Sequence, residues 1–274
     1  MELTETIETI LAHRSVRTYR SESLSEAHLQ LLTEAMRRGP SSSALQNYTV
    51  ILITEQDLKE QLARLCGNQA YIAQCPLFIV TCVDLRRVEK AALARDYPYR
   101  ASDLRILLSA TEDVAIAVQN ASLAAQSLGL ATVMIGGVMN GSREIAALLG
   151  LPPRVAPLLG LCVGYSDEDP KVIPPRPRLP KEVVFHRERY QLSEREEERL
   201  LDRHDQEVIS SGFYHARHIP FDELFPAASV DPVGPDGYGW TEHVARKQAR
   251  LWWEGATEKL WEDFEAMGLR LRRE

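Results

Sequence analysis

The chain has few cysteines, and no two of them have the spacing of a metal or redox motif. Cys66, Cys75, Cys82 and Cys162 are the four among 274 residues, and none forms a Cys-x-x-Cys pair. Two of them lie in apolar, strand-like runs, where a thiol behaves as a small hydrophobic side chain. We therefore expect reduced cysteines in the core and no metal site.

Long apolar runs are missing as well. No run approaches the roughly 18 residues that a transmembrane helix needs. The chain opens with Glu2, Glu5 and Glu8, whereas a secretory leader is basic and then apolar. We expect neither a signal peptide nor contact with a membrane, and a cytoplasmic location.

A broad excess of positive charge is also absent. The formal net charge is -7 and the basic groups are local, which argues against a general nucleic-acid binder. No Gly-x-Gly-x-x-Gly follows a strand-like run, so a separate Rossmann module for a dinucleotide is not expected. What remains is a chain of 274 residues with 45% hydrophobic residues, enough for a packed core.

One short basic stretch stands out, at residues 12–19. His13, Arg14, Ser15 and Arg17 follow an amphipathic helix expected at about 4–12. Alternate residues of an extended segment face the same way, so His13, Ser15 and Arg17 can line one wall, and guanidinium groups suit a phosphate or another delocalised anion. The stretch is typical of an anion-binding clamp; the alternative is a solvated basic loop that pairs with nearby acids.

A second basic pair lies far along the chain, in Pro-Arg-Pro-Arg-Leu-Pro at 175–180. The prolines favour a rigid, extended segment with Arg176 and Arg178 on one face. Between the two basic stretches lie the serine triplet 41–43 and the pair Gly136-Gly137. These offer hydroxyls and bare backbone N–H groups that could approach a ligand closely.

Apolar periodicity predicts an α+β sandwich, because helices stand at both ends and between the strands rather than in a regular βαβ ladder. Ser25 is a good N-cap and Gly39 lies past the end of its helix. The expected helices are about 4–12, from Ser25 to Gly39, 55–66, 103–128, one capped by Ser142, 193–209 and a last one within 241–267; the expected strands are 47–54, 76–83, 131–135 and 155–165, with 183–185 extended.

The last third of the chain differs in character. Residues 211–240 form a long stretch rich in proline, glycine and aromatic residues. Loops of this length commonly cover a site. We expect a core at 1–190 and a helical C-terminal extension at 191–274 in the same domain unit, with this loop covering the site.

Eight stretches match one family in the family's order and cover roughly residues 5–190. They are 13–17, 41–46, 67–69 with 72–74, 127–130, 135–137, 149–152, 159–165 and 176–180. On these motifs the chain resembles the nitroreductase family of FMN-dependent oxidoreductases, specifically the oxygen-insensitive nitroreductase and NADPH-flavin oxidoreductase group. The resemblance implies a sandwich with a central, mostly antiparallel sheet flanked by helices, and a long central helix at a homodimer interface.

The resemblance also implies where non-covalent FMN is held. His13, Arg176 and Arg178 would bind the phosphate, while Arg17 would lie by the pyrimidine edge, where it favours the negative charge of the reduced ring. The Gly136-Gly137 backbone would approach the ring. The cofactor-binding set so implied is His13, Arg14, Ser15, Arg17, Ser41, Ser42, Ser43, Gln69, Ile135, Gly136, Gly137, Arg176 and Arg178. Gln69 could match the pyrimidine edge or the ribityl hydroxyls, and the serines could bond the ribityl chain or cap a helix.

The implied activity is hydride transfer from NADPH or NADH to FMN, followed by two-electron reduction of nitroaromatics, quinones or free flavin in a ping-pong scheme. Asp236-Gly237-Tyr238-Gly239 stands where close relatives have paired arginines for the NADPH 2′-phosphate, so the choice of nicotinamide stays open. Candidates for substrate binding are Ser43, Arg246 and Arg250.

Three other functions remain open at this point. The chain could be a flavin reductase or a dehydrogenase of another small molecule on the same scaffold. It could be a flavin-binding protein that has lost nicotinamide turnover and serves sensing or assembly. The plainest alternative is a globular phosphate-binding protein without flavin.

Overall fold

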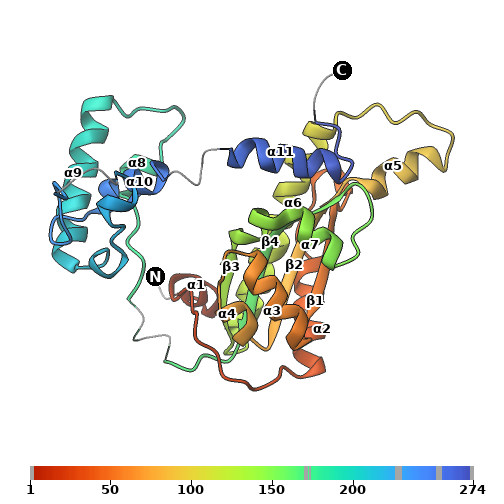
Figure 1. The fold of residues 1–274 in the computed structure, drawn as a ribbon, viewed down its shortest axis with the longest axis horizontal. Helices are drawn as coiled ribbons and strands as arrows, with labels where there is room; N and C mark the ends of the chain where they lie inside the picture. Colours follow the sequence, from red (N-terminus) through yellow and green to blue (C-terminus); the bar gives the residue numbers. More distant parts are fainter. Residues whose placement is uncertain (1–2, 170–171, 173, 226–229, 251–254, 272–274) are drawn as a thin grey trace. The chain divides into compact units, whose positions relative to one another are not determined.

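The computed structural model describes residues 3–169, 172, 174–225, 230–250 and 255–271. The chain divides into two compact units, Met1–Ile173 with Glu258–Glu274, and Pro174–Thr257. Figure 1 follows the chain by colour.

The first unit is built on a four-stranded sheet in the order β1-β2-β4-β3, with every neighbouring pair antiparallel. The expected antiparallel sheet is thus confirmed. The strands are β1 (Tyr48–Ile53), β2 (Leu77–Asp84), β3 (Ala131–Ile135) and β4 (Val155–Gly164). All eight residues of β2 are buried, as its apolar run predicts, whereas β1 is only partly buried because it forms an edge of the sheet.

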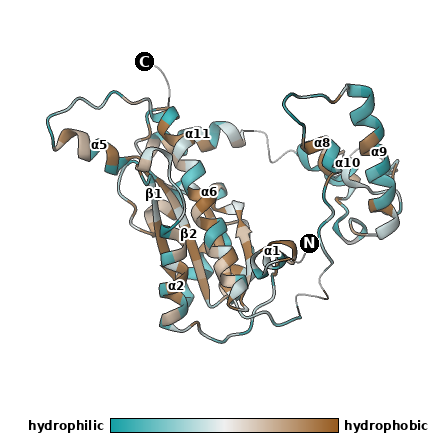
Figure 2. Ribbon diagram, turned by 180° about the vertical axis from the view of Figure 1, so that it is seen from behind, coloured by the Kyte–Doolittle hydropathy of each residue, from teal (hydrophilic) through white to brown (hydrophobic). Residues whose placement is uncertain are grey.

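Alternating side chains of β2 divide the core into two halves, one on each face of the sheet. Leu77, Ile79 and Val83 pack in a cluster with α6 and α2, while Phe78 and Val80 pack in a second cluster beneath α3 and α7. This is the alternation expected of a strand covered on both faces. The result is a helix–sheet–helix sandwich, and Figure 2 shows β1 and β2 mostly in brown, the hydrophobic end of the scale.

Eight helices of the described residues flank or follow this sheet. Their bounds are α1 (Glu5–Leu11), α2 (Glu26–Arg37), α3 (Gln56–Leu65), α4 (Tyr71–Gln74), α5 (Arg86–Leu93), α6 (Asp103–Ser127), α7 (Ser142–Leu148) and α11 (Ala256–Ala266), with short 3₁₀ turns η1 (Ser42–Ala44) and η2 (Gly136–Gly141). Ser25 caps α2 by accepting a hydrogen bond from the backbone N–H of His28. The long helix α6 ends before Gly129, whose φ of 75° lies in the left-handed region that glycine adopts freely.

The end of the chain is joined to the first unit through Arg154 and Asp103. The Arg154 guanidinium donates two hydrogen bonds of 2.8 Å to the Asp103 carboxylate, and both residues are buried. It also donates to the carbonyl of Gly268, and Asp103 accepts the backbone N–H of Arg270. One buried ion pair therefore links the start of α6, the start of β4 and the segment after α11.

The second unit is helical. It contains α8 (Lys181–Val184), α9 (Glu194–Ser211), η4 (His215–Arg217), η5 (Phe221–Glu223) and α10 (Trp240–Gln248). Its small core comprises Val208, Tyr214, Ile219 and Tyr238. The ribbon of α9 is largely teal in Figure 2, the hydrophilic end of the scale, in line with its charged sequence.

Three local expectations are wrong. Gly141 is the N-cap of α7 and Ser142 is its first helical residue, with a hydroxyl that donates to the Met139 carbonyl instead of capping. Residues 183 and 184 belong to the short helix α8, which starts after Pro180, rather than to an extended run. The segment 241–267 holds two helices, α10 and α11; Trp252 and Trp253 lie outside the described residues.

No helix among the described residues is both long and apolar enough to span a membrane.

Candidate functional site

The basic stretch runs along the free edge of β3. Ser15 forms a parallel bridge with Thr132, and the Val16 N–H donates to the Thr132 carbonyl at 3.0 Å. Val16 is buried at 1% exposure, while Ser15 and Arg17 on either side of it are exposed. Ser15 and Arg17 thus point away from the core, as the alternation of an extended segment predicts.

A chain of polar contacts ties His13 to the last turns of α6. The His13 ring nitrogen Nδ1 lies 3.3 Å from the Gln126 side-chain oxygen, and the Gln126 amide nitrogen donates to the hydroxyl of Ser122. Ser122 in turn lies 2.9 Å from the hydroxyl of Thr132, on the strand that holds Ser15. The position of His13 is therefore set by α6 and β3 together.

Arg17, Gln69, Tyr71, Gly136 and Gly137 form a second group, which we call the Arg17 cluster. The Arg17 guanidinium carbon lies 5.9 Å from the centre of the Tyr71 ring, within the range of a cation–π contact. The Tyr71 hydroxyl donates to the Gln69 side-chain oxygen, and the Gln69 amide nitrogen donates to the Cys66 carbonyl at 2.5 Å. Both ends of the Gln69 amide are thereby oriented, which leaves one N–H and one lone pair for a ligand.

The two glycines of this cluster have opposite surroundings. A Cβ built on Gly137 would overlap the Cys66 carbonyl and the Gln69 amide, while one built on Gly136 would meet nothing within 4 Å. Gly137 is therefore required by the packing of the protein itself. Gly136 leaves bare backbone next to open space, at the end of β3 and exposed.

The serine triplet has a different anchor. The Ser42 N–H and the Asn47 N–H donate to the two carboxylate oxygens of Asp113, at 2.9 and 3.0 Å. The Ser41 hydroxyl accepts the N–H of Gln46 at 2.9 Å. Asp113 lies in the middle of α6 and is 2% exposed.

Within one chain the serine triplet and His13 are held at separate places on α6. Gln126 follows Asp113 by thirteen residues, or about 20 Å along an α-helix. The serine triplet also precedes β1, and Ser15 pairs with β3, and these strands are the two edges of the sheet. The structure therefore brings His13, Ser15, Arg17, Gln69, Ile135 and the glycine pair to the β3 side of the first unit, and the serines to the β1 side.

The remaining candidates belong to the second unit. Arg176 and Arg178 are exposed on a stretch without helix or strand. Arg246, in contrast, is buried at 2% exposure, with hydrogen bonds to Asp231, Glu242 and the Ile219 carbonyl. The Arg246 hydrogen bond holds the pKa of Asp231 well below its usual range. Arg250 pairs with Glu223 at 3.2 Å.

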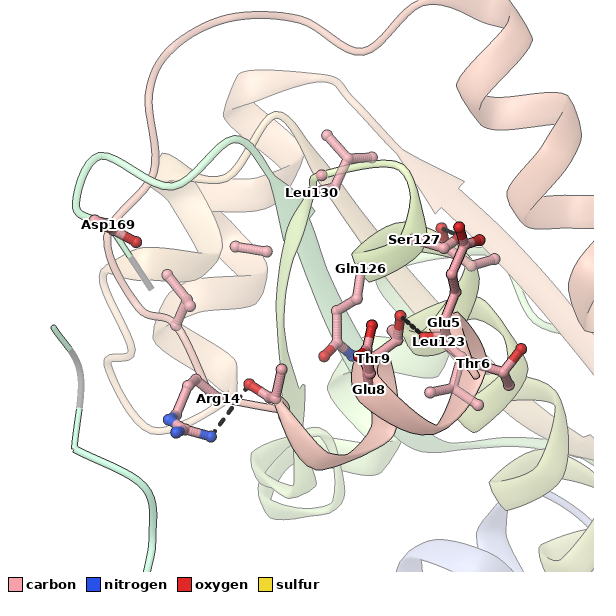
Figure 3. Close-up of a pocket in the computed structure, with 15 residues that line it drawn as sticks. Glu5, Thr6, Glu8, Thr9, Arg14, Leu123, Gln126, Ser127, Leu130 and Asp169 are labelled. Carbon is pink, nitrogen blue, oxygen red and sulfur yellow. Dashed lines mark hydrogen bonds between the residues drawn. The ribbon is translucent and has the colours of Figure 1, made fainter. Parts of the chain in front are cut away.

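A cavity of about 880 Å³ lies beside the basic stretch (Figure 3). Its labelled side chains come from α1, such as Glu8, and from the end of α6, such as Gln126, with Arg14 and Asp169 at one side. Arg14 is the one residue of the expected cofactor set that lines it. None of the Arg17 cluster lines this cavity, so the two are separate features of the first unit.

The cysteines take no part in either group through their thiols. All four are free and buried, as expected. Burial raises the pKa of Cys66 and of Cys82 to about 12. Both thiols are therefore protonated near neutral pH, which makes them poor nucleophiles.

The donors of the Arg17 cluster and its neighbours fit a flavin mononucleotide. FMN presents an anionic phosphate, hydroxyls and an amide-like ring edge. The described residues supply an exposed guanidinium at Arg17, an oriented amide at Gln69 and open backbone at Gly136. Backbone without a side chain is what a planar ring edge needs for close approach.

The chain belongs to the nitroreductase family, whose model matches residues 10–165. It is 38% identical to the NADPH-flavin oxidoreductase of Vibrio harveyi over 189 residues, 69% of this chain and 76% of that protein. It is 37% identical to the oxygen-insensitive NADPH nitroreductase of Salmonella typhimurium over 206 residues, 75% of this chain and 82% of that protein. These relatives confirm the family and the group that the sequence motifs indicate.

A solved structure agrees with the fold. The NADPH:FMN oxidoreductase from Vibrio harveyi complexed with NAD+ superposes with a TM-score of 0.75 at 29% identity, covering 95% of this chain and 98% of that one. The expected nitroreductase fold, including its long central helix, is confirmed.

Three residues of the site escape the sequence motifs. Tyr71 orients Gln69, Gln126 holds His13, and Asp113 holds the serine segment. A signal exists for Asp113, because it is three residues after Ala110 and four before Ala117, on the apolar face of α6. A polar residue at such a position needs a partner, but the partner cannot be named from the sequence.

Proposed function

We propose that the protein is an FMN-dependent oxidoreductase that takes hydride from NADPH or NADH and reduces nitroaromatics, quinones or free flavin by a two-electron ping-pong mechanism. The observation that carries this proposal is the Arg17 cluster, in which a guanidinium, an oriented amide and open glycine backbone from three chain segments meet at the end of β3. Bound FMN would supply the redox chemistry, accepting a hydride and passing on two electrons.

Each residue of the cluster has a defined task in this proposal. Arg17 provides fixed positive charge where negative charge develops at the pyrimidine edge. Gln69 donates from its remaining amide N–H, and Tyr71 keeps that amide in one orientation. Gly136 and Gly137, directly after Ile135, let the backbone approach the ring. His13, with Arg14 and Ser15 beside it, is proposed to serve the phosphate; the assignment of Arg176 and Arg178 to the same phosphate stays a prediction.

The relatives favour an enzyme over a flavin protein without turnover. Both curated relatives named above are oxidoreductases with NADPH in their names, and the solved neighbour is a complex with NAD+. Either nicotinamide is therefore a reasonable hydride donor for this chain. We still predict that Arg246 and Arg250 bind substrate and that residues 211–240 cover the site. The cytoplasmic location also stays a prediction.

The glycine pair provides a prediction with an internal control. Gly137→Ala should lower the melting temperature and FMN content together, because its methyl group would displace the Cys66 carbonyl and the Gln69 amide. Gly136→Ala has room for its methyl group, so the melting temperature of the apoprotein should be unchanged while FMN binds at least about tenfold more weakly. Calorimetry measures the melting temperature, and flavin absorbance measures the bound FMN. FMN binding at wild-type strength in Gly136→Ala would show that the Gly136 backbone does not closely approach the flavin ring.

We further propose a homodimer in which the serine segment of one copy completes the flavin site of the other. Two features support this: the separation of about 20 Å along α6 between the anchors of Ser42 and His13, and exposed apolar residues on α6 itself. Leu104 is 47% and Leu108 59% exposed, and residues four apart share one helix face. Such a stripe is typical of a helix that packs against a partner.

The dimer proposal predicts the behaviour of Leu108→Glu. A carboxylate on the exposed stripe of α6 would have to be desolvated in the interface, so this variant should be monomeric at micromolar concentration in light scattering and should lose FMN. Glu22→Gln, a neutral change at an exposed position in the loop before α2, serves as the control. A monomeric wild-type protein that retains FMN would contradict the shared site.

Turnover tests the proposed function itself. Purified protein should be yellow, and it should oxidise NADPH or NADH in the presence of menadione or nitrofurazone. Bound flavin without turnover of any acceptor would support the flavin-binding alternative. Colourless protein that does not take up added FMN would exclude both.

A further inference from the structure

The segment 41–47 between α2 and β1 has an unusual backbone. Ser43, Ala44 and Gln46 have φ values of 50°, 56° and 51°. Residues other than glycine seldom adopt this left-handed region, because their Cβ crowds the backbone. Three such residues within four positions persist only where surrounding contacts hold them.

Asp113 is the contact that holds both ends of this segment. Its two carboxylate oxygens accept the Ser42 N–H and the Asn47 N–H, at 2.9 and 3.0 Å. A buried carboxylate that accepts two amides is strongly bound to them, because charge-assisted hydrogen bonds are stronger than neutral ones. Asp113 is 2% exposed, and Asn47 is fully buried.

Two further contacts keep the segment in this shape. The Ser41 hydroxyl accepts the N–H of Gln46, and the Arg87 guanidinium donates to the Gln46 carbonyl at 2.7 Å. The middle of the segment, Ser43 and Ala44, is exposed. The contacts thus fix the ends and leave the residues between them free to meet a ligand.

We propose that Asp113 is a positioning residue for flavin binding. It acts through the serine segment, whose strained conformation it stabilises before FMN binds, so that Ser42 and Ser43 present their hydroxyls without reorganisation. This inference rests on the proposed function, since it takes the serines to contact FMN. Asp113 itself is buried and serves the segment through its two amides.

Asp113→Asn is the direct test, because it keeps the shape of the side chain. One of its two terminal atoms becomes an NH₂ group, which must face a backbone N–H donor, so one end of the segment is released. FMN should dissociate at least about tenfold more readily than from the wild type, measured as the FMN fluorescence that appears on dilution of the holoprotein. Excess added FMN should restore kcat, because the variant is impaired in holding the cofactor rather than in turnover. Glu22→Gln removes an exposed charge from the loop before α2 and should leave FMN binding unchanged.

A second substitution separates positioning from general stability. Glycine adopts positive φ without strain, so Ala44→Gly in the Asp113→Asn background should recover much of the lost FMN affinity. A helix that was merely weakened would gain nothing from this change. FMN affinity at the wild-type level in Asp113→Asn, or the absence of recovery in the double variant, would overturn the proposal.

Amide hydrogen exchange keeps the test independent of flavin. The Ser42 N–H should exchange slowly in the wild type and faster in Asp113→Asn; equal rates would overturn the claim. If wild-type protein carries no FMN, the proposed function fails while the exchange result still decides what Asp113 does. If Asp113→Asn does not fold, Asp113→Glu is read in the same way, because its extra methylene prevents the carboxylate from matching both amides.

Discussion

Arg17→Gln is expected to lower kcat/KM for nicotinamide-dependent reduction by about 10²-fold, the usual loss when one preorganised electrostatic donor is removed. Arg17 is exposed at the free edge of β3 and is held by a hydrogen bond to the Ser15 carbonyl and by the Tyr71 ring. A guanidinium fixed in this way favours the more negative, reduced form of a flavin beside it. Its loss should therefore also lower the flavin midpoint potential.

Two readouts and one control make this test specific. The midpoint potential is measured by equilibration with a reference dye, and kcat/KM by initial rates with menadione. Arg20→Gln removes another exposed arginine three residues further along and should change neither. If Arg17→Gln retains FMN with an unchanged potential and rate, Arg17 does not lie at the ring.

Asp103→Asn should lower the free energy of unfolding by about 3 kcal/mol, the lower end of the cost of breaking a buried ion pair. The variant leaves the buried Arg154 guanidinium without its bidentate partner, and the Arg270 N–H with a weaker acceptor. Glu89 still lies 2.7 Å from Arg154, which limits the loss. Urea denaturation measures it, with Glu22→Gln, an exposed loop position, as the control.

The same ion pair predicts a dependence on pH. Burial alone would raise the pKa of Asp103, but the Arg154 hydrogen bonds and charge outweigh it, so that the pKa is lowered. A carboxyl with a lowered pKa in the folded state contributes stability above its unfolded pKa, and this is lost as the pH falls through the folded value. Wild-type stability should therefore fall below about pH 4 more steeply than that of Asp103→Asn. Parallel curves would show that Asp103 does not carry this dependence.

Local patterns account for most of the fold that the sequence predicted. The N-cap Ser25, the glycine stop at 129 and the apolar run of β2 each act within a few residues, and each is present as expected. The errors arise where tertiary contacts, rather than the local sequence, determine the local structure. Ser142 resembles an N-cap, yet its backbone is already helical and its hydroxyl turns back to Met139.

In the candidate site, too, features set by the local sequence could be predicted, whereas features set by tertiary contacts could not. The exposed sides of Ser15 and Arg17 follow from alternation along an extended chain. The pairing of Ser15 with Thr132 joins segments that are distant in sequence. The contacts of Gln69 with Tyr71 and Cys66 lie within a turn, where the sequence has no regular period. Asp113 illustrates the limit most clearly, since its partners lie 71 and 66 positions away and no periodicity relates them.

Anaerobic stopped-flow absorbance shows whether the bound flavin accepts hydride from a nicotinamide. The purified protein is mixed with NADPH, and separately with NADH, in the absence of any electron acceptor. We expect at least one of them to bleach the visible flavin band of the protein in a single phase, and menadione added afterwards to restore it. A bound flavin that stays oxidised with both nicotinamides would show that the protein does not take hydride from either.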